Sequence, residues 1–286
     1  MQYLILAVIC SASIALVLKF FRSQEGNRYG IIIGNYLTCI LISLFMIGDP
    51  FRIISSEPSA YICGAIGGVL FVGGLVFMQS SIRANGATLT SAFGKLGVMV
   101  PLAMSFIFFS EKPAPVQVAG IASALVSLVV INYPSKEENK EPGPASYSFV
   151  LLMLTFMANG LADSMAKVFE RTGNRDDDTV YIMIVFATAC IISAVLAYLE
   201  YKKTGKKILP KELLAGIAVG IPNYYSSFFL LGAVERLPSF LVYPIFSTGT
   251  ILMVMAVSTL AFKERPSRNQ TIGIGLILLA LVLLNL

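Results

Sequence analysis

The feature that most constrains this chain is a succession of ten apolar blocks, each about as long as a bilayer is thick. The blocks cover residues 3–21, 29–48, 60–81, 87–109, 115–132, 147–168, 179–199, 211–232, 238–262 and 267–286. A helix needs ~20 apolar residues to cross the hydrocarbon core. Blocks such as GIGLILLALVLL are apolar on every face, whereas helices of soluble proteins carry an apolar stripe beside a polar face. The sequence therefore predicts an all-α polytopic integral membrane protein with ten transmembrane helices.

Composition agrees with a lipid-embedded chain. Of its 286 residues, 56% are hydrophobic and 13% charged, and the mean hydropathy is +0.79. Soluble domains have about 25% charged residues. The net charge of +5 comes from basic residues in short loops, where membrane topology explains them, so nucleic acid is not an expected partner. The first block has no basic segment ahead of it and leads into further blocks, so we interpret it as a span, not a signal peptide.

Residue usage also narrows the chemistry. Cys10, Cys39, Cys63 and Cys190 all lie inside apolar blocks without CxxC spacing, which is typical of small buried hydrophobic residues. The chain has no histidine, the usual ligand of catalytic zinc and the usual proton relay near neutral pH. It has no Walker motif either, so ATP is not the expected energy source. We expect no metal and no cofactor.

The chain repeats itself. Residues 109–132 align without a gap with 262–285, and ten of the 24 positions match. The informative matches are polar or special for the backbone, namely Glu111 with Glu264, Pro113 with Pro266, Gln117 with Gln270 and Gly120 with Gly273. Carboxylates favour helix N-termini and proline suits a first helical turn. We therefore expect the two glutamates to cap the fifth and tenth helices or to pair with neighbouring basic residues, with a gating role as the alternative.

A second echo extends the repeat to whole halves. Lys19 is followed by Gly-Asn-Arg at 26–28, and Lys167 is followed by Gly-Asn-Arg at 173–175. We predict a first five-helix repeat at 1–132, a charged linker at 133–146 and a second five-helix repeat at 147–286. Because five is odd, the second repeat enters the membrane from the opposite side. Inverted repeats of this kind are typical of secondary transporters.

Ten spans in two halves, with the fourth and ninth spans ending in Glu-(Lys/Arg)-Pro followed by Gln and Gly, resemble the drug/metabolite transporter superfamily and its EamA-like branch. The resemblance implies a carrier of small metabolites such as amino acids. It also implies a central site lined by helices of both halves, chiefly the first, third, fourth, sixth, eighth and ninth. The Trp-Gly pair often found in the first and sixth spans of that branch is replaced by CSAS and MANG, so the substrate of other members does not transfer.

Two ionisable residues lie well inside the spans. Lys95 is near the middle of the fourth and Asp163 is in the inner half of the sixth. A charge at the bilayer centre costs about 2.5–3.5 kcal/mol on insertion scales, and such residues usually face a bundle interior or a watery cavity. Lys95 either pairs with Asp163, reaches a headgroup, or binds a carboxylate or phosphate; we favour binding, with Ser91 one turn away in the same helix.

A polar stripe runs along the sixth span. Asn159, Asp163 and Lys167 follow one another at spacings of four and so share a helix face. Asp163 and Lys167 either neutralise each other, or Asp163 binds an amino group or a coupling proton. The corresponding residues of the first half end in Lys19, which makes Asp163, Lys19 and Lys167 candidates for coupling or gating.

The eighth and ninth spans supply further candidates for the substrate site. Asn223, Tyr224 and Tyr225 follow Gly220 and Pro222, which weaken a helix at membrane depth, and Tyr243 precedes a proline in the ninth span. Buried hydroxyls seek hydrogen-bond partners and cavities supply them. We expect these side chains, with Ser91, Lys95, Asn159 and Asp163, to bind the substrate.

The distribution of charged residues and the family resemblance predict opposite orientations of the chain in the membrane. With the N-terminus inside, six Lys and Arg residues lie in cytoplasmic loops and fourteen in outer loops. The positive-inside rule therefore favours both termini outside, whereas the resemblance implies both inside. The expected location is the cell membrane, as a multi-pass protein of the plasma or inner membrane of a prokaryote.

The leading hypothesis is a secondary active transporter of a small polar organic metabolite, amino acid-like or otherwise carboxylate-bearing, that works by alternating access. One rival is an exporter of organic cations in which Asp163 is essential and Lys95 is its counterion. Another is a membrane-embedded enzyme, but the spans hold no histidine, no acid pair and no Ser-Lys arrangement for catalysis. Expected partners are a small-molecule substrate and the lipid bilayer, and a monomer is the starting expectation.

Overall fold

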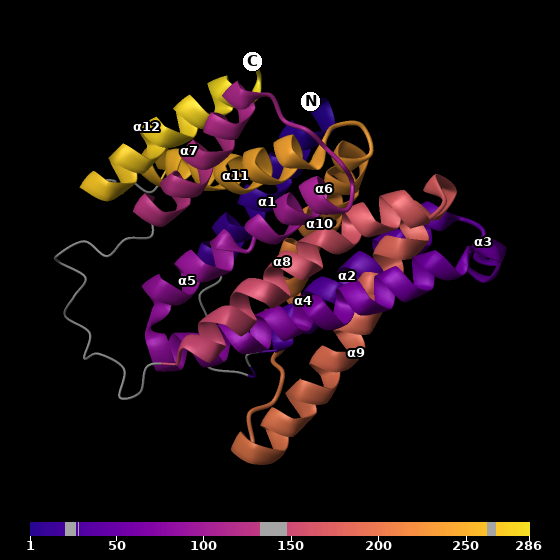
Figure 1. Ribbon diagram of the computed structural model, residues 1–286. Helices are drawn as coiled ribbons and strands as arrows, with labels where there is room; N and C mark the ends of the chain where they lie inside the picture. The colour runs from indigo at the N-terminus through magenta and orange to yellow at the C-terminus, as the bar shows by residue number, and fades with distance from the viewer. Residues whose placement is uncertain (21–26, 28, 132–147, 262–266) are drawn as a thin grey trace. The chain divides into compact units, whose positions relative to one another are not determined.

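The computed structural model contains helices and no strands in the residues that it describes, which are 1–20, 27, 29–131, 148–261 and 267–286 (Figure 1). The helices are α1 (Gln2–Phe20), α2 (Gly30–Ile47), α3 (Pro50–Ser55), α4 (Pro58–Asn85), α5 (Ala87–Leu96), α6 (Met99–Ile107), α7 (Pro115–Ile131), α8 (Phe149–Thr172), η1 (Arg175–Asp177), α9 (Asp178–Thr204), α10 (Pro210–Val234), α11 (Ser239–Ala261) and α12 (Arg268–Leu284). Each predicted apolar block contains helical structure, which confirms the all-α fold class.

Among the residues that the structure describes, seven helical segments are long and apolar enough to cross a membrane. They lie at Gly30–Ile47, Pro58–Asn85, Leu89–Ile107, Phe149–Thr172, Arg175–Thr204, Pro210–Val234 and Ser239–Leu260. The apolar helices α1, α7 and α12 have 19, 17 and 17 residues, which corresponds to ~26–29 Å against a hydrocarbon core of ~30 Å. These spans support a multi-pass membrane protein, while ten crossings stay a prediction.

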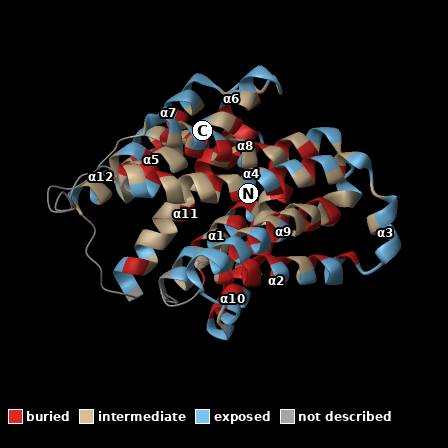
Figure 2. Ribbon diagram, turned by 90° about the horizontal axis from the view of Figure 1, so that it is seen from below, coloured by how far each residue is buried: buried red, intermediate tan, exposed pale blue. Residues whose placement is uncertain are grey.

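The outward surface of the helices is apolar, as a lipid solvent requires. Phe45 is 85% exposed and Leu260 is 82% exposed. Along α2, buried and exposed residues divide the helix between a packed side and an open side (Figure 2). Large apolar side chains on the open side cost nothing in hydrocarbon, so the usual burial of such residues is not needed.

The chain forms two compact units. Unit 1 contains residues 1–72 and 165–235, and unit 2 contains residues 73–164 and 236–286. The boundaries fall within α4 and α8, so each unit draws on both halves of the sequence. The units therefore do not coincide with the predicted repeats at 1–132 and 147–286, which describe a relation of sequence and stay a prediction. The predicted linker at 133–146 lies outside the described residues.

Helices of unit 1 approach closely at glycines. A Cβ atom built on Gly216 of α10 would lie 2.6 Å from the Cα of Gly34 of α2, and one on Gly220 would lie 2.7 Å from the carbonyl oxygen of Asn35. The α4 helix meets α9 in the same way, because a Cβ at Gly68 would lie 2.6 Å from the carbonyl oxygen of Val185. Small residues let helix backbones pack closely where lipid supplies no hydrophobic drive for association.

In unit 2, α7 packs along α12, and the repeated glutamines mark where both helices begin. Gln117 Oε1 accepts a 3.0 Å hydrogen bond from the backbone N–H of Ala114, and Gln270 Oε1 accepts one of 2.8 Å from Ser267. The Ser267 hydroxyl accepts in return from the Gln270 N–H, which completes a capping box. The repeated Gln is therefore a device that starts a helix.

Glu111 caps a different helix from the one predicted. Its Oε2 accepts hydrogen bonds from the Ser105 hydroxyl at 2.5 Å and from the backbone N–H of Phe240, in the first turn of α11, at 3.3 Å. The expected attraction of a carboxylate to a helix N-terminus holds, but α11 receives it, not the fifth span. Glu264 and Pro266 lie outside the described residues.

Candidate functional site

The predicted fourth span is helical from Leu89 to Ile107, but its α-helical hydrogen bonding is interrupted by a tighter turn at Gly97 and Val98, which keep right-handed dihedral angles. The α5 helix ends at Leu96, the α6 helix begins at Met99, and Gly97 and Val98 form a turn between them. The Val98 N–H donates to the carbonyl oxygen of Lys95 at 3.3 Å, so the helix tightens just after the lysine. Pro101 has no N–H to offer the carbonyl of Gly97, which accepts from Val100 at 2.9 Å instead. Lys95 thus occupies the last turn of α5, where a cation complements the helix dipole.

The α8 helix packs directly against this break. A Cβ atom at Gly160 would lie 2.5 Å from the carbonyl oxygen of Gly97, and one at Gly97 would lie 3.1 Å from the Gly160 nitrogen. Beside this contact, Asn159 lies against Gly94 of α5, with 3.3 Å between its Nδ2 and a Cβ built there, and against Gly74 of α4. Only glycine leaves room for these approaches, so the sequence fixes α8 against the turn.

Lys95 and Asp163 are brought into one electrostatic environment. Both residues lie in unit 2, and their opposite charges attract each other. Both side chains nevertheless are exposed, and within the described residues they form no close ion pair. A charged group at membrane depth is tolerated against protein or water but is costly against lipid.

Tyr243 holds the backbone beside Asp163. Its ring is 1% exposed, and its hydroxyl donates a 2.8 Å hydrogen bond to the main-chain carbonyl oxygen of Asp163. The following residue, Pro244, leaves α11 unbroken. Tyr243 thus contacts the α8 backbone and is not open to a solute, whereas Ser91, one turn before Lys95 on α5, is partly exposed.

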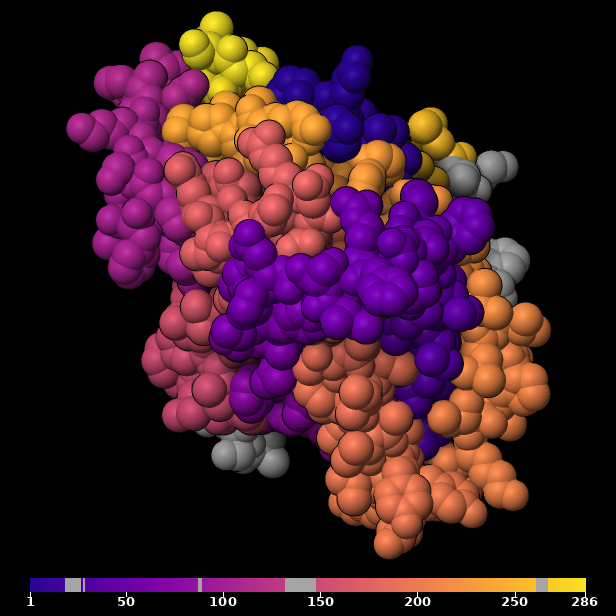
Figure 3. Space-filling model, turned by 90° about the vertical axis from the view of Figure 1, so that its right-hand side faces the viewer, coloured from indigo at the N-terminus to yellow at the C-terminus, as the bar shows by residue number. Residues whose placement is uncertain are grey.

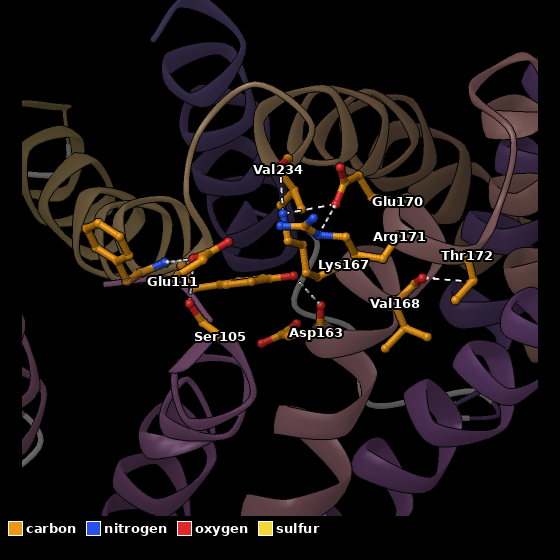
Figure 4. A network of polar contacts seen from close by, with 11 residues as sticks. Ser105, Glu111, Asp163, Lys167, Val168, Glu170, Arg171, Thr172 and Val234 are labelled. Atoms are coloured by element: carbon orange, nitrogen blue, oxygen red, sulfur yellow. Dashed lines mark hydrogen bonds and ion pairs between the residues drawn. The ribbon is translucent and has the colours of Figure 1, made fainter. Parts of the chain in front are cut away.

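Lys167 pairs with Glu170 in place of Asp163. Its Nζ lies 2.9 Å from Glu170 Oε2 and 3.4 Å from the carbonyl oxygen of Val234, the last residue of α10. Arg171 Nε lies 3.5 Å from the same glutamate oxygen (Figure 4). Lys167 is 4% exposed, so Lys167 and Glu170 form a buried ion pair at the ends of α8 and α10, with the half-exposed Arg171 beside it, all within unit 1.

The α10 candidates are also in unit 1 and are packed. Asn223 Nδ2 donates to Asn35 Oδ1 of α2 at 3.1 Å, and the Tyr224 ring is 0% exposed. Tyr225 is partly buried and makes an edge contact with Tyr224 at a centroid distance of 5.4 Å. The structure thus collects Ser91, Lys95, Asn159, Asp163 and Tyr243 in unit 2 and the three α10 residues in unit 1. The side chain of Lys19 lies outside the described residues.

Two positioning contacts of this site were missed from the sequence. The Gly97–Gly160 approach had a signal, since Gly94, Gly97 and Pro101 interrupt an otherwise helical block. The hydrogen bond from Tyr243 to Asp163 had none, because the two residues are 80 positions apart. The partner of Lys167 was visible as Glu170 at i+3, an equally good helical neighbour as Asp163 at i−4.

The fold and these residues define a multi-pass helical membrane protein with charged side chains beside a broken span. Residues 147–286 match the EamA-like transporter family. This match over the second half of the chain supports a membrane transporter of the drug/metabolite transporter superfamily, as the resemblance implied. Members of the family are membrane transporters.

Two further likenesses cover nearly the whole chain. An uncharacterized protein of Haemophilus influenzae is 24% identical over 285 residues, which is 96% of this chain and 94% of that protein. A crystal structure of another protein is similar with a TM-score of 0.73 at 15% sequence identity, covering 99% of this chain and 94% of that one. At this identity the second likeness shows the fold alone.

Proposed function

We propose that the protein is a secondary active transporter of a small polar organic metabolite that carries a carboxylate, such as an amino acid-like solute. The observation that carries the proposal is the placement of Lys95 in the last turn before a break in its span, exposed and without a close ion pair among the described residues. Broken helices at membrane depth are where transporters bind substrates and coupling ions.

In this proposal the two charges divide the work. Lys95 binds the carboxylate of the solute, and Asp163 with Asn159 binds an amino group or a coupling proton. Tyr243 is a positioning residue that acts through the backbone of Asp163. Two inverted five-helix repeats exchange conformations to move access from one side of the cell membrane to the other. No catalytic role is assigned to these residues.

Reconstituted transport tests the proposal. Purified protein is reconstituted into liposomes that are loaded with a pool of unlabelled amino acids and carboxylates. The counterflow of each radiolabelled solute into these liposomes is then measured. We expect at least one carboxylate-bearing solute to exchange, with a tenfold or greater loss in Lys95→Gln. The control Lys112→Gln removes an exposed lysine of the same unit beyond α6 and should keep full exchange. Absence of exchange by every solute, or an undiminished rate in Lys95→Gln, contradicts the assignment.

Export of organic cations is a second candidate, favoured by Asp163, an exposed acidic residue on α8. In this function Asp163 binds the cation and Lys95 is its counterion. Efflux of a quaternary amine that is abolished by Asp163→Asn and tolerates Lys95→Gln supports the cation exporter. The opposite dependence, with carboxylate exchange, supports the metabolite carrier.

A further inference from the structure

Four lysines crowd the connection between α9 and α10. Lys202 and Lys203 lie in the last turn of α9, and Lys206 and Lys207 follow Gly205, which ends the helix in the left-handed conformation with φ 71°. All four are exposed, and residues 202–207 contain no acidic residue. We call residues 202–207 the lysine turn. Like charges packed into so short a segment repel one another unless an anionic partner offsets them.

The lysine turn is held in place by a buried asparagine. Asn27 is 1% exposed, and its side-chain Nδ2 donates to the carbonyl oxygens of Ala197 at 3.0 Å and Lys206 at 3.4 Å. Its backbone N–H donates to the carbonyl oxygen of Lys207 at 3.2 Å. The backbone of the turn is therefore held against Asn27, with the carbonyls of Lys206 and Lys207 turned inward, so only the lysine side chains remain to be ordered when a ligand binds.

The residues before the turn fit a membrane–water interface. Tyr198 is 56% exposed, Leu199 54% and Tyr201 43%, and the Lys202 ammonium lies 5.1 Å from the centre of the Tyr198 ring. Tyrosines concentrate at the level of lipid headgroups, with apolar residues on the hydrocarbon side. The end of α9 lies at the surface of the molecule (orange, lower edge of Figure 3). The lysines thus follow directly on a segment that enters lipid.

We propose that the lysine turn binds the phosphate groups of anionic phospholipids in the bilayer that the protein spans. Clustered lysines directly beside a membrane span are attracted to anionic lipid, with about a fivefold gain in affinity for each lysine near the surface. Exposed ammonium groups fit a phosphodiester as point charges. The aromatic and aliphatic residues of α9 contact the same lipid's upper acyl region.

Lipid binding by the full-length protein tests this inference and does not depend on transport. Native mass spectrometry of the protein in detergent is titrated with phosphatidylglycerol and, separately, with phosphatidylcholine. We expect a preference for phosphatidylglycerol that falls at least tenfold when all four lysines are changed to glutamine. The matched variant with all four lysines changed to arginine should keep the preference. Lys112→Gln, which removes an exposed lysine of unit 2, should leave the preference unchanged.

Three results overturn the inference. An equal affinity of the wild-type protein for the two lipids does so, as does a preference that survives in the four-glutamine variant. The third result is displacement of bound phosphatidylglycerol by millimolar inorganic phosphate, because a site specific for lipid should retain the phospholipid. The preference should also weaken between 50 and 500 mM salt, since screening shortens the reach of the lysines; this wild-type measurement stands even if the variant folds poorly.

Discussion

The hydroxyl of Tyr243 donates a 2.8 Å hydrogen bond to the main-chain carbonyl oxygen of Asp163. This bond ties α11 to α8 at the residue that carries one of the two charges of the candidate site. The carbonyl is held, while Asp163 as a whole residue is exposed. The arrangement separates the structural use of Asp163 from any binding use, so the two can be varied independently.

Tyr243→Phe removes this bond and keeps the buried ring. Loss of a single buried hydrogen bond costs about 1 kcal/mol, so we expect a small loss of thermal stability. Transport should fall by ~5-fold at constant protein, because a shift of that free energy in the placement of Asp163 corresponds to that factor. Counterflow and thermal unfolding of the same preparation check both. An unchanged transport rate would show that the bond does not position Asp163.

Pro101→Ala restores an N–H four residues after Gly97. We expect α5 and α6 to join into a straighter helix, with equal or higher thermal stability, because proline inside a helix costs about 3 kcal/mol. Transport should nevertheless be lost, since Lys95 would no longer lie at a helix end. Stability and counterflow are measured together. Retained transport in a variant of raised stability would mean that the break has no functional use.

Lys167→Met leaves Glu170 in a buried setting with Arg171 as its remaining partner. Breaking a buried pair by removing one member typically costs about 3–5 kcal/mol, and replacing both members often costs much less. We therefore expect thermal unfolding to show a large loss for Lys167→Met and a partial recovery when Glu170→Leu is added. If transport recovers together with stability, the cluster is structural; if only stability recovers, Lys167 contributes to coupling or gating.

Gly216→Ala places a methyl group against Gly34 at the contact of α2 and α10. We expect the free energy of unfolding to fall by about 1–3 kcal/mol, as at other over-packed sites, because the atoms that face the new methyl group belong to the backbone. Gly275→Ala in α12 is the matched control, since a Cβ there meets nothing within 4 Å and alanine favours a helix over glycine by up to ~1 kcal/mol. A stabilised Gly216→Ala would refute the close packing.

The all-α class and the position of most helices could be predicted, because hydropathy depends only on the local sequence. The first block, 3–21, became α1 (Gln2–Phe20), and the last, 267–286, became α12 (Arg268–Leu284). The break at Gly97 and Val98 was not predicted. Hydropathy does not register a glycine and a proline that change the backbone without changing polarity, and the block stays apolar throughout.

The candidate charges could be found from the sequence, but their partners could not. Lys95 and Asp163 stand out because they are ionisable residues within apolar blocks. Glu111 was expected to serve the helix that follows it in sequence, yet it accepts from Phe240, 129 residues away. A carboxylate selects a helix N-terminus by proximity in space, and sequence spacing does not reveal which of several N-termini is near.

The two echoes in the sequence have a common structural meaning that bears on the ancestry of the chain. Asn27 and Asn174 each accept from the backbone N–H two residues ahead, and Gln117 and Gln270 each accept at the start of a helix. Lipid-facing residues can change at almost no cost, whereas a helix that loses its starting signal begins at the wrong residue. Distant relatives of half this length are therefore better sought by the residues that start their helices than by their apolar segments.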